Sequence, residues 1–304
     1  MKPKIVSLML AVMLLLTTGL TAAHADPFLP GGWVKASNPV LAPGTAGSWD
    51  DQWVYAPSLL LDGSTYKMWY VSYSAASSAR KIGYATSPDG TTWTKYGSAP
   101  VLSPGTAGSW DAQGVSFPSV IKDGSTYKMY YTGLNATGER RIGYATSPDG
   151  ITWTKFGSAP VFGAGAPGAW DATHVSNPNV VKVAENNYKM WYSGWTDTNN
   201  GIGYATSTDG LTWTRVGTAP VMPYLGYGWD ASPYSPNVVF DGKGYHMWYS
   251  GCDYSGDACQ TGYATSPDGA TWTPRQLVLP LGTAGAFDDG SADYGSVIQA
   301  NGAL

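Results

Sequence analysis

Three aspartates, Asp51, Asp289 and Asp293, stand where this 304-residue chain departs from its own internal repeat. The other copies have alanine at the position shared by Asp51 and Asp289, and tyrosine or serine at the position of Asp293. Two carboxyl groups that face one bond can act as a general acid and as a base or nucleophile. We therefore interpret the three as candidate catalytic acids, with solvated loop aspartates as the alternative.

Aromatic and polar residues break the repeat close to the same aspartates. Flat rings can stack on the C–H faces of a sugar, and amide or imidazole groups can hydrogen bond to its hydroxyls. Packing in the core is the alternative for each ring. The candidate substrate-binding residues are Trp53, Tyr55, Phe117, His174, Asn177, Trp195 and Tyr234.

A repeat of about 60 residues must position these side chains. Near copies of IGYATSPDGTTWTK occur at 82–95, 142–155, 202–215 and 261–274, and each follows a block such as Tyr-Lys-Met-Trp-Tyr. Each unit reads as four strands, which in the first copy are expected at 54–61, 66–73, 81–86 and 92–101. Asp-Gly and Pro-Asp-Gly supply the tight turns between them.

The motif of the outer strand occurs once more than the other motifs, beginning at Trp33. We therefore predict an all-β fold, a five-bladed β-propeller of four-stranded antiparallel blades, in which this N-terminal outer strand closes the ring. The inner strand of the last blade is expected at 293–299. The rest of the fifth blade is absent, which indicates either a truncated chain or a ring with an exposed strand edge.

The N-terminus has the pattern of a secretory signal peptide. Lys2 and Lys4 precede the apolar run 5–16, and Ala23-His24-Ala25 offers a cleavage site. An uncleaved membrane anchor is the alternative. The pattern predicts a signal peptide at 1–25, a propeller domain at 26–304, and a secreted or periplasmic protein with no membrane span after cleavage.

The mature domain offers few charged partners and few metal ligands. A net charge of −4 with 17 Lys and Arg provides no basic face for nucleic acid. Cys252 and Cys259 lie in one segment, and we expect them to form a local disulfide. Only His174 and His246 accompany them in the mature chain, which disfavours a zinc site. We predict a monomer with no metal and no cofactor.

The order of the motifs resembles the five-bladed propeller glycosidases, which include glycoside hydrolase families 32, 43, 62, 68 and 130. The likeness spans 33–304 and rests on these elements: Asn38-Pro39-Val40-Leu41, a Trp-Asp pair, a proline in the inner strand, Tyr-Lys-Met-Trp-Tyr and Ile-Gly-Tyr-Ala-Thr-Ser-Pro-Asp-Gly. It implies hydrolysis of a glycosidic bond by carboxyl groups near the starts of inner strands.

The chain departs from that family pattern where the acids are expected. In place of an Asp-Pro it has Ala56-Pro57, Phe117-Pro118 and Asn177-Pro178. Two hypotheses follow. One is an exported glycoside hydrolase that acts on plant or microbial polysaccharide, and the other is a non-catalytic propeller that binds a glycan or a protein.

Overall fold

The computed structural model describes residues 35–253, 255–256 and 258–298. The predicted signal peptide and the start of the N-terminal outer strand lie outside them. The described residues form strands and loops, with no helix among them. The strands are β1 (Trp53–Asp62), β2 (Thr65–Ser74), β3 (Ser77–Ser87), β4 (Thr94–Lys95), β5 (Gly114–Asp123), β6 (Thr126–Leu134), β7 (Arg140–Ser147), β8 (Thr154–Lys155), β9 (His174–Ala184), β10 (Asn187–Trp195), β11 (Asn200–Ser207), β12 (Thr214–Arg215), β13 (Met222–Pro223), β14 (Ser232–Phe240), β15 (Tyr245–Cys252), β16 (Cys259–Ser266) and β17 (Thr273–Leu279).

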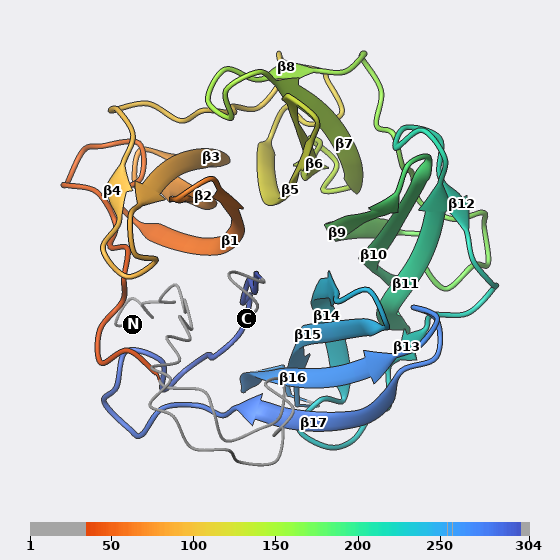
Figure 1. The fold of residues 1–304 in the computed structure, drawn as a ribbon. Helices are drawn as coiled ribbons and strands as arrows, with labels where there is room; N and C mark the ends of the chain where they lie inside the picture. Colours follow the sequence, from red (N-terminus) through yellow and green to blue (C-terminus); the bar gives the residue numbers. More distant parts are fainter. Residues whose placement is uncertain (1–34, 254, 257, 299–304) are drawn as a thin grey trace.

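Four antiparallel units are arranged around a central axis (Figure 1). We call them blades 1 to 4, formed by β1–β4, β5–β8, β9–β12 and β14–β17. The first strand of each blade lies nearest the axis (Figure 1). A single parallel bridge between Arg80 and Gly114 joins blades 1 and 2.

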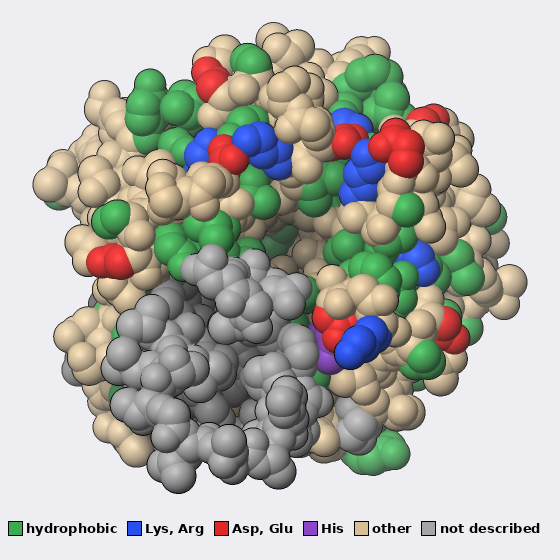
Figure 2. Space-filling view, in the orientation of Figure 1, with side chains coloured by type: hydrophobic (Ala, Val, Ile, Leu, Met, Phe, Trp, Pro, Cys, Tyr) green, Lys and Arg blue, Asp and Glu red, His purple; other side chains and the backbone are tan. Residues whose placement is uncertain are grey.

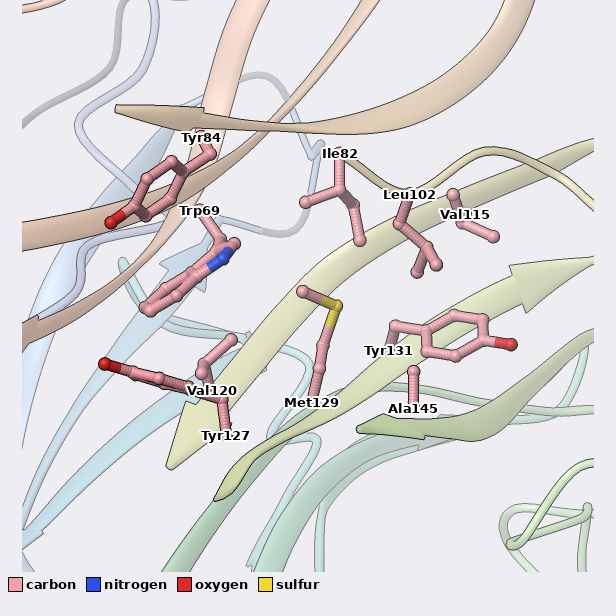
Figure 3. Packing of buried hydrophobic residues seen from close by; sticks show 10 residues of the cluster. All are labelled: Trp69, Ile82, Tyr84, Leu102, Val115, Val120, Tyr127, Met129, Tyr131 and Ala145. Atoms are coloured by element: carbon pink, nitrogen blue, oxygen red, sulfur yellow. The ribbon is translucent and has the colours of Figure 1, made fainter. Parts of the chain in front are cut away.

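Large side chains fill the space between neighbouring blades. Trp69 of β2 is fully buried, and its indole donates a hydrogen bond to the carbonyl of Gly150 in blade 2 (2.7 Å). Met129 and Tyr131 lie in the same cluster (Figure 3). The alternating pattern of Tyr-Lys-Met-Trp-Tyr therefore points its aromatic residues into the core between blades.

We call the first strand of each blade, together with residues 291–298, the inner segments. Each inner segment contains a strained residue. Ala56 of β1 has φ of 47°, in the left-handed region that disfavours side chains, and the pairing of β1 with β2 shifts between Tyr55 and Ser58. Phe117, Asn177, Ser235 and Tyr294 occupy the equivalent positions and have φ between 48° and 54°. The resulting bulge turns the side chains before it toward one end of the axis.

The inner segments hold one another in a circle. In each segment, one backbone N–H donates a hydrogen bond to a side-chain oxygen of the preceding segment. The segment at 291–298 takes part as a fifth member. The bonds run from Val120 to Ser58 (2.9 Å), Val180 to Ser119 (2.9 Å), Val238 to Asn179 (2.9 Å), Val297 to Asn237 (2.8 Å) and Leu59 to Ser296 (3.2 Å). A shift in the backbone of one segment therefore alters the hydrogen bonds of its neighbours.

The fifth blade differs from the expectation. Within the described residues, 35–52 and 280–298 form no strand, although Ser291 makes one bridge to Cys259. The expected strands at the N-terminus and at 293–299 are therefore absent from that part of the chain. An inner segment needs a second strand to pair with along its length, and none lies there. The count of five blades stays a prediction.

The outer strand of blade 1 is also shorter than predicted. Only Thr94 and Lys95 of the expected 92–101 pair as β4, followed by a bridge between Ile82 and Leu102. Gly97 has φ of 61° and turns the chain, and Pro100 has no N–H to donate to a ladder. Blade 4 has no glycine there, and its outer strand β17 continues from Thr273 to Leu279.

The predicted disulfide between Cys252 and Cys259 is confirmed, with the two Cα atoms 4.1 Å apart. It joins the end of β15 to the start of β16. Over the described ranges, we find no helix with the length and apolar character needed to cross a membrane.

Candidate functional site

The first halves of the inner strands surround a cavity of about 450 Å³ at one end of the axis. A neck of about 40 Å³, lined by the strained residues and the prolines after them, separates it from a hollow of about 360 Å³ at the other end. Figure 2 shows one end of the axis, where acidic and basic side chains lie around a central hollow. Aromatic residues line the cavity from several blades: Trp53, Tyr55, Tyr73, Phe117, Trp195, Tyr234 and Tyr294.

Six of the seven predicted substrate-binding residues line this cavity. They are Trp53, Tyr55, Phe117, Asn177, Trp195 and Tyr234. His174 stands beside it, where its Nδ1 accepts a hydrogen bond from the backbone N–H of Arg140 (3.3 Å). Burial and the nearby Arg140 and Arg141 lower the pKa of His174, which favours the neutral ring that can accept that bond. The ligand-binding role of all seven stays a prediction.

Tyr294 lies at the centre of an aromatic cluster in the cavity. Its ring centroid is 5.4 Å from Phe117, 5.5 Å from Tyr234 and 6.1 Å from Tyr55. Tyr55 and Phe117 also meet edge to face at 6.0 Å. Edge-to-face contacts hold the rings in fixed orientations. The cavity thus has a rigid aromatic wall at the end nearest the neck.

Two arginines add positive charge to the wall. Arg80 of β3 donates from Nε to the hydroxyl of Tyr55 (2.7 Å). The guanidinium of Arg140, at the start of β7, lies over the ring of Trp195 at 5.3 Å. Burial and the charge of Arg80 lower the pKa of Arg140. Both arginines are among the residues that line the cavity.

Two of the three predicted catalytic acids hold loops in place. Asp51 accepts from the backbone N–H groups of Gly47 and Ala75, both at 2.8 Å, and these bonds lower its pKa. Asp289 accepts from the backbone N–H of Gly285 (2.8 Å) and is exposed. Their shared repeat position therefore supplies a loop cap, and neither residue lines the cavity.

Asp293 lies behind the wall of the cavity, 6% exposed. Its Oδ2 accepts a hydrogen bond from the hydroxyl of Tyr234 (2.6 Å), and its Oδ1 accepts one from Ser291. Burial raises its pKa, which the two hydroxyl groups oppose. Of the three predicted acids, Asp293 is the one in contact with a residue of the cavity wall.

No aspartate or glutamate is among the described residues that line the cavity. The aspartates that follow an aromatic residue in every copy are buried and paired with a basic side chain. These pairs are Asp50 with Lys95 (2.5 Å), Asp111 with Lys155 (2.5 Å), Asp171 with Arg215 (2.8 Å), Asp230 with Arg275 (3.4 Å) and Asp288 with Lys35 (2.7 Å). They serve the fold, as the repetition of the position predicts.

Sequence reasoning missed Arg80, Arg140 and Tyr294. The signal was present, because Arg80 and Arg140 occupy the repeat position that holds Asn200 in the third copy and Cys259 in the fourth. These positions differ between the copies in basic residues, whereas the predicted site was drawn from acidic, aromatic and polar residues. Tyr294 takes the place of Ala56 in a copy with few recognisable strands.

Comparisons with known proteins agree with the architecture. The family described as the glycosyl hydrolases family 32 N-terminal domain matches residues 50–230. An uncharacterized protein of Mycobacterium tuberculosis is 31% identical over 232 residues, which cover 72% of this chain and 73% of the relative. The predicted likeness to the propeller glycosidases is confirmed at this level.

Two further matches carry names of carbohydrate-active proteins. A β-1,2-mannobiose phosphorylase of Thermoanaerobacter is 29% identical over 115 residues, covering 34% of this chain and 37% of the relative. A solved structure of a glycosyl hydrolase from Bacteroides ovatus has a TM-score of 0.68 at 20% identity, covering 84% of this chain and 83% of that one. The second likeness concerns the fold alone.

Proposed function

The chain belongs to the family of glycosyl hydrolases family 32 N-terminal domains, and from that premise we propose that it is a secreted, monomeric propeller that binds a plant or microbial glycan in the cavity. The aromatic wall of the cavity is the observation that carries the proposal. Its volume of about 450 Å³ falls within the range of small-molecule sites, roughly 300–1,000 Å³.

The placement of the acids favours binding over hydrolysis. Hydrolysis of a glycosidic bond uses two carboxyl groups that face the bond across about 5 to 10 Å. The described lining of the cavity has none, and Asp51 and Asp289 are engaged by backbone N–H groups of loops. Sugar hydroxyls find donors and acceptors instead in Asn200, Ser232 and Tyr73.

Glycan binding can be tested by calorimetry with a panel of plant and microbial oligosaccharides. We expect Trp53→Ala and Trp195→Ala each to weaken binding about tenfold or more, since stacking area is lost. Tyr96→Ala is the matched control, because Tyr96 is 53% exposed and outside the cavity. The absence of binding to any glycan would refute the proposal, as would equal losses in all three variants.

Secretion rests on the predicted signal peptide and on the disulfide, which forms in oxidising compartments. The N-terminal sequence of the exported protein tests it. A mature chain that begins near Asp26 is expected, and retention of residues 1–25 would contradict export by cleavage.

Hydrolysis is the second candidate, and Asp293 is the observation in its favour. A buried carboxyl group with a raised pKa can hold a proton for a leaving oxygen, and Tyr234 links it to the cavity. A screen against aryl-glycosides and polysaccharides, with Asp293→Asn, Asp51→Asn and Asp289→Asn alongside, decides. Turnover that is lost in Asp293→Asn with the fold retained would establish the enzyme.

A further inference from the structure

We propose that the cavity selects glycans that carry an anionic substituent, such as the carboxylate of a uronic acid, through the guanidinium groups of Arg80 and Arg140. This inference rests on the proposed function and names the ligand class of the same site. It is carried by two cationic side chains that face one cavity without a carboxylate partner.

The two arginines come from equivalent positions in adjacent blades. Arg80 is held beside blade 2 by its bridge to Gly114, and Arg140 begins the corresponding strand β7. The same position in blade 3 is Asn200, whose Oδ1 accepts from Ser232 (3.1 Å), and in blade 4 it is Cys259, locked in the disulfide. Two neighbouring blades thus present cations to the cavity, and the next presents a neutral amide.

The nearest acidic residue in the sequence is directed elsewhere. Glu139 contacts Arg141 (3.7 Å) and accepts from the side chain of Asn135 (2.8 Å). Within the described parts of the chain, neither Arg80 nor Arg140 forms an ion pair with a carboxylate. No described residue accepts a hydrogen bond from the Nη groups of either arginine. Both residues line the cavity, so these donors are available to a ligand bound there.

The chemistry of these donors matches an oxyanion. A guanidinium presents two parallel N–H groups that fit both oxygens of a carboxylate. The hydroxyl of Tyr55 fixes Arg80 and the ring of Trp195 supports Arg140, so little rotamer freedom remains to be lost on binding. Trp53 and Trp195 line the same cavity and offer aromatic surface to the sugar ring of the ligand.

Placing two like charges in one partly buried site opposes folding, and an anionic ligand would offset that. The protein as a whole has a formal charge of −4, so the sign of the cavity is opposite to that of the chain. A neutral sugar would leave both guanidinium groups uncompensated. The site therefore favours an acidic sugar over its neutral counterpart.

The experiment compares trigalacturonic acid with its methyl ester, which has the same sugars and no charge, by calorimetry at two salt concentrations. We expect the acid to bind at least about tenfold more tightly, and Arg80→Gln and Arg140→Gln each to remove about a factor of ten from that affinity. Added salt should weaken the binding of the acid more than that of the ester.

Lys81→Gln is the matched control. It removes the same charge from the residue next to Arg80, and Lys81 does not line the cavity. A sulfated oligosaccharide paired with its desulfated form serves as a second arm, and a preference for the sulfated member also supports anion selection, with sulfate as the source.

The remaining outcomes separate the inference from the proposed function. Equal affinity for acid and ester, unchanged in the arginine variants, would overturn anion selection and leave carbohydrate binding intact. Competition by inorganic phosphate alone as effective as that by the acid would overturn recognition of an anionic glycan. Failure of every glycan to bind would refute the proposed function itself.

Discussion

The two ends of the central axis differ in whether their charged side chains form ion pairs. At the end lined by the last residues of the inner strands, Asp62 contacts Lys67 (2.8 Å) and Lys122 (2.5 Å). Basic and acidic side chains lie together around the hollow in the view of Figure 2. At the other end, Arg80 and Arg140 face the cavity without a carboxylate among the described residues.

The paired end is repeated, and the unpaired end is not. Asp123 contacts Lys128 (2.6 Å) and Lys182 (2.7 Å) in the same way, one blade further along the chain. Lys182 comes from the next blade, so each cluster links two blades. The comparison teaches that charges at repeated positions stabilise the ring, whereas Arg80 and Arg140, at a position that the later copies do not keep basic, have no carboxylate partner among the described residues.

The largest expected effect comes from removing the aspartates of the charge clusters at the paired end. We expect the double variant Asp62→Asn, Asp123→Asn to lose about 2 kcal/mol of unfolding free energy at neutral pH, a modest value because both clusters are partly exposed. Their lysine partners lower the pKa of both aspartates. Their contribution is therefore present above about pH 4 and is lost as the pH falls through the native pKa values.

Urea unfolding of this double variant and of the wild type, near pH 7 and near pH 2, measures the effect. The difference in stability should shrink at the lower pH, and affinity for a glycan at neutral pH should be unchanged. A loss of binding that accompanies a retained fold would show that the two ends are coupled.

A pH series tests the buried carboxyl group of Asp293. Burial raises the pKa of this group. The native state then keeps its proton to a higher pH than the unfolded chain, which ionises near pH 3.9. Its contribution is fully present below about pH 4 and is lost as the pH rises through the native pKa. Relative to the wild type, Asp293→Asn should therefore gain stability as the pH rises from about 3.5 to 7.

The same urea titrations with Asp51→Asn provide the control for Asp293. Backbone hydrogen bonds lower the pKa of Asp51, so its variant should change in the opposite direction over that range. A wild type and an Asp293→Asn variant with identical pH dependence would contradict burial of an ionisable group at this position.

The repeats made most of the fold predictable. The expected strands 54–61 and 66–73 correspond to β1 (Trp53–Asp62) and β2 (Thr65–Ser74), because alternation and Asp-Gly turns specify strands locally. The short outer strand was not foreseen, since pairing there depends on the turn at Gly97. The fifth blade offered little local pattern, and its inner segment is held by side chains of other blades.

The site was predictable in part for the same reason. Six of the proposed ligand-binding residues could be placed because they break the repeat on strands that converge on the axis. Asp51 also breaks the repeat, but its role depends on the backbone N–H groups of Gly47 and Ala75, which are set by loop geometry. A departure from a repeat indicates that a position is free to vary, and its neighbours in space determine its use.

The neck between the two ends offers a smaller effect on stability. Ala56 has φ of 47°, a conformation that glycine adopts without strain, and we expect Ala56→Gly to raise the unfolding free energy by about 0.5 kcal/mol. Ala85→Gly is the control, because Ala85 is buried in the extended strand β3 and should lose about 1 kcal/mol. Equal losses in both variants would contradict strain at the neck.

The smallest expected change in stability comes from Arg140→Gln, and it tests the comparison most directly. The variant loses the contact between the guanidinium and the ring of Trp195, worth about 0.5–1 kcal/mol, and gains by removing a partly buried charge near Arg80. These effects oppose each other, so the free energy of unfolding should stay within about 0.5 kcal/mol of the wild type. Urea unfolding measures it. A loss as large as that of the aspartate double variant would mean that Arg140 stabilises the ring as the repeated lysines do. Its charge would then not be available to bind a ligand.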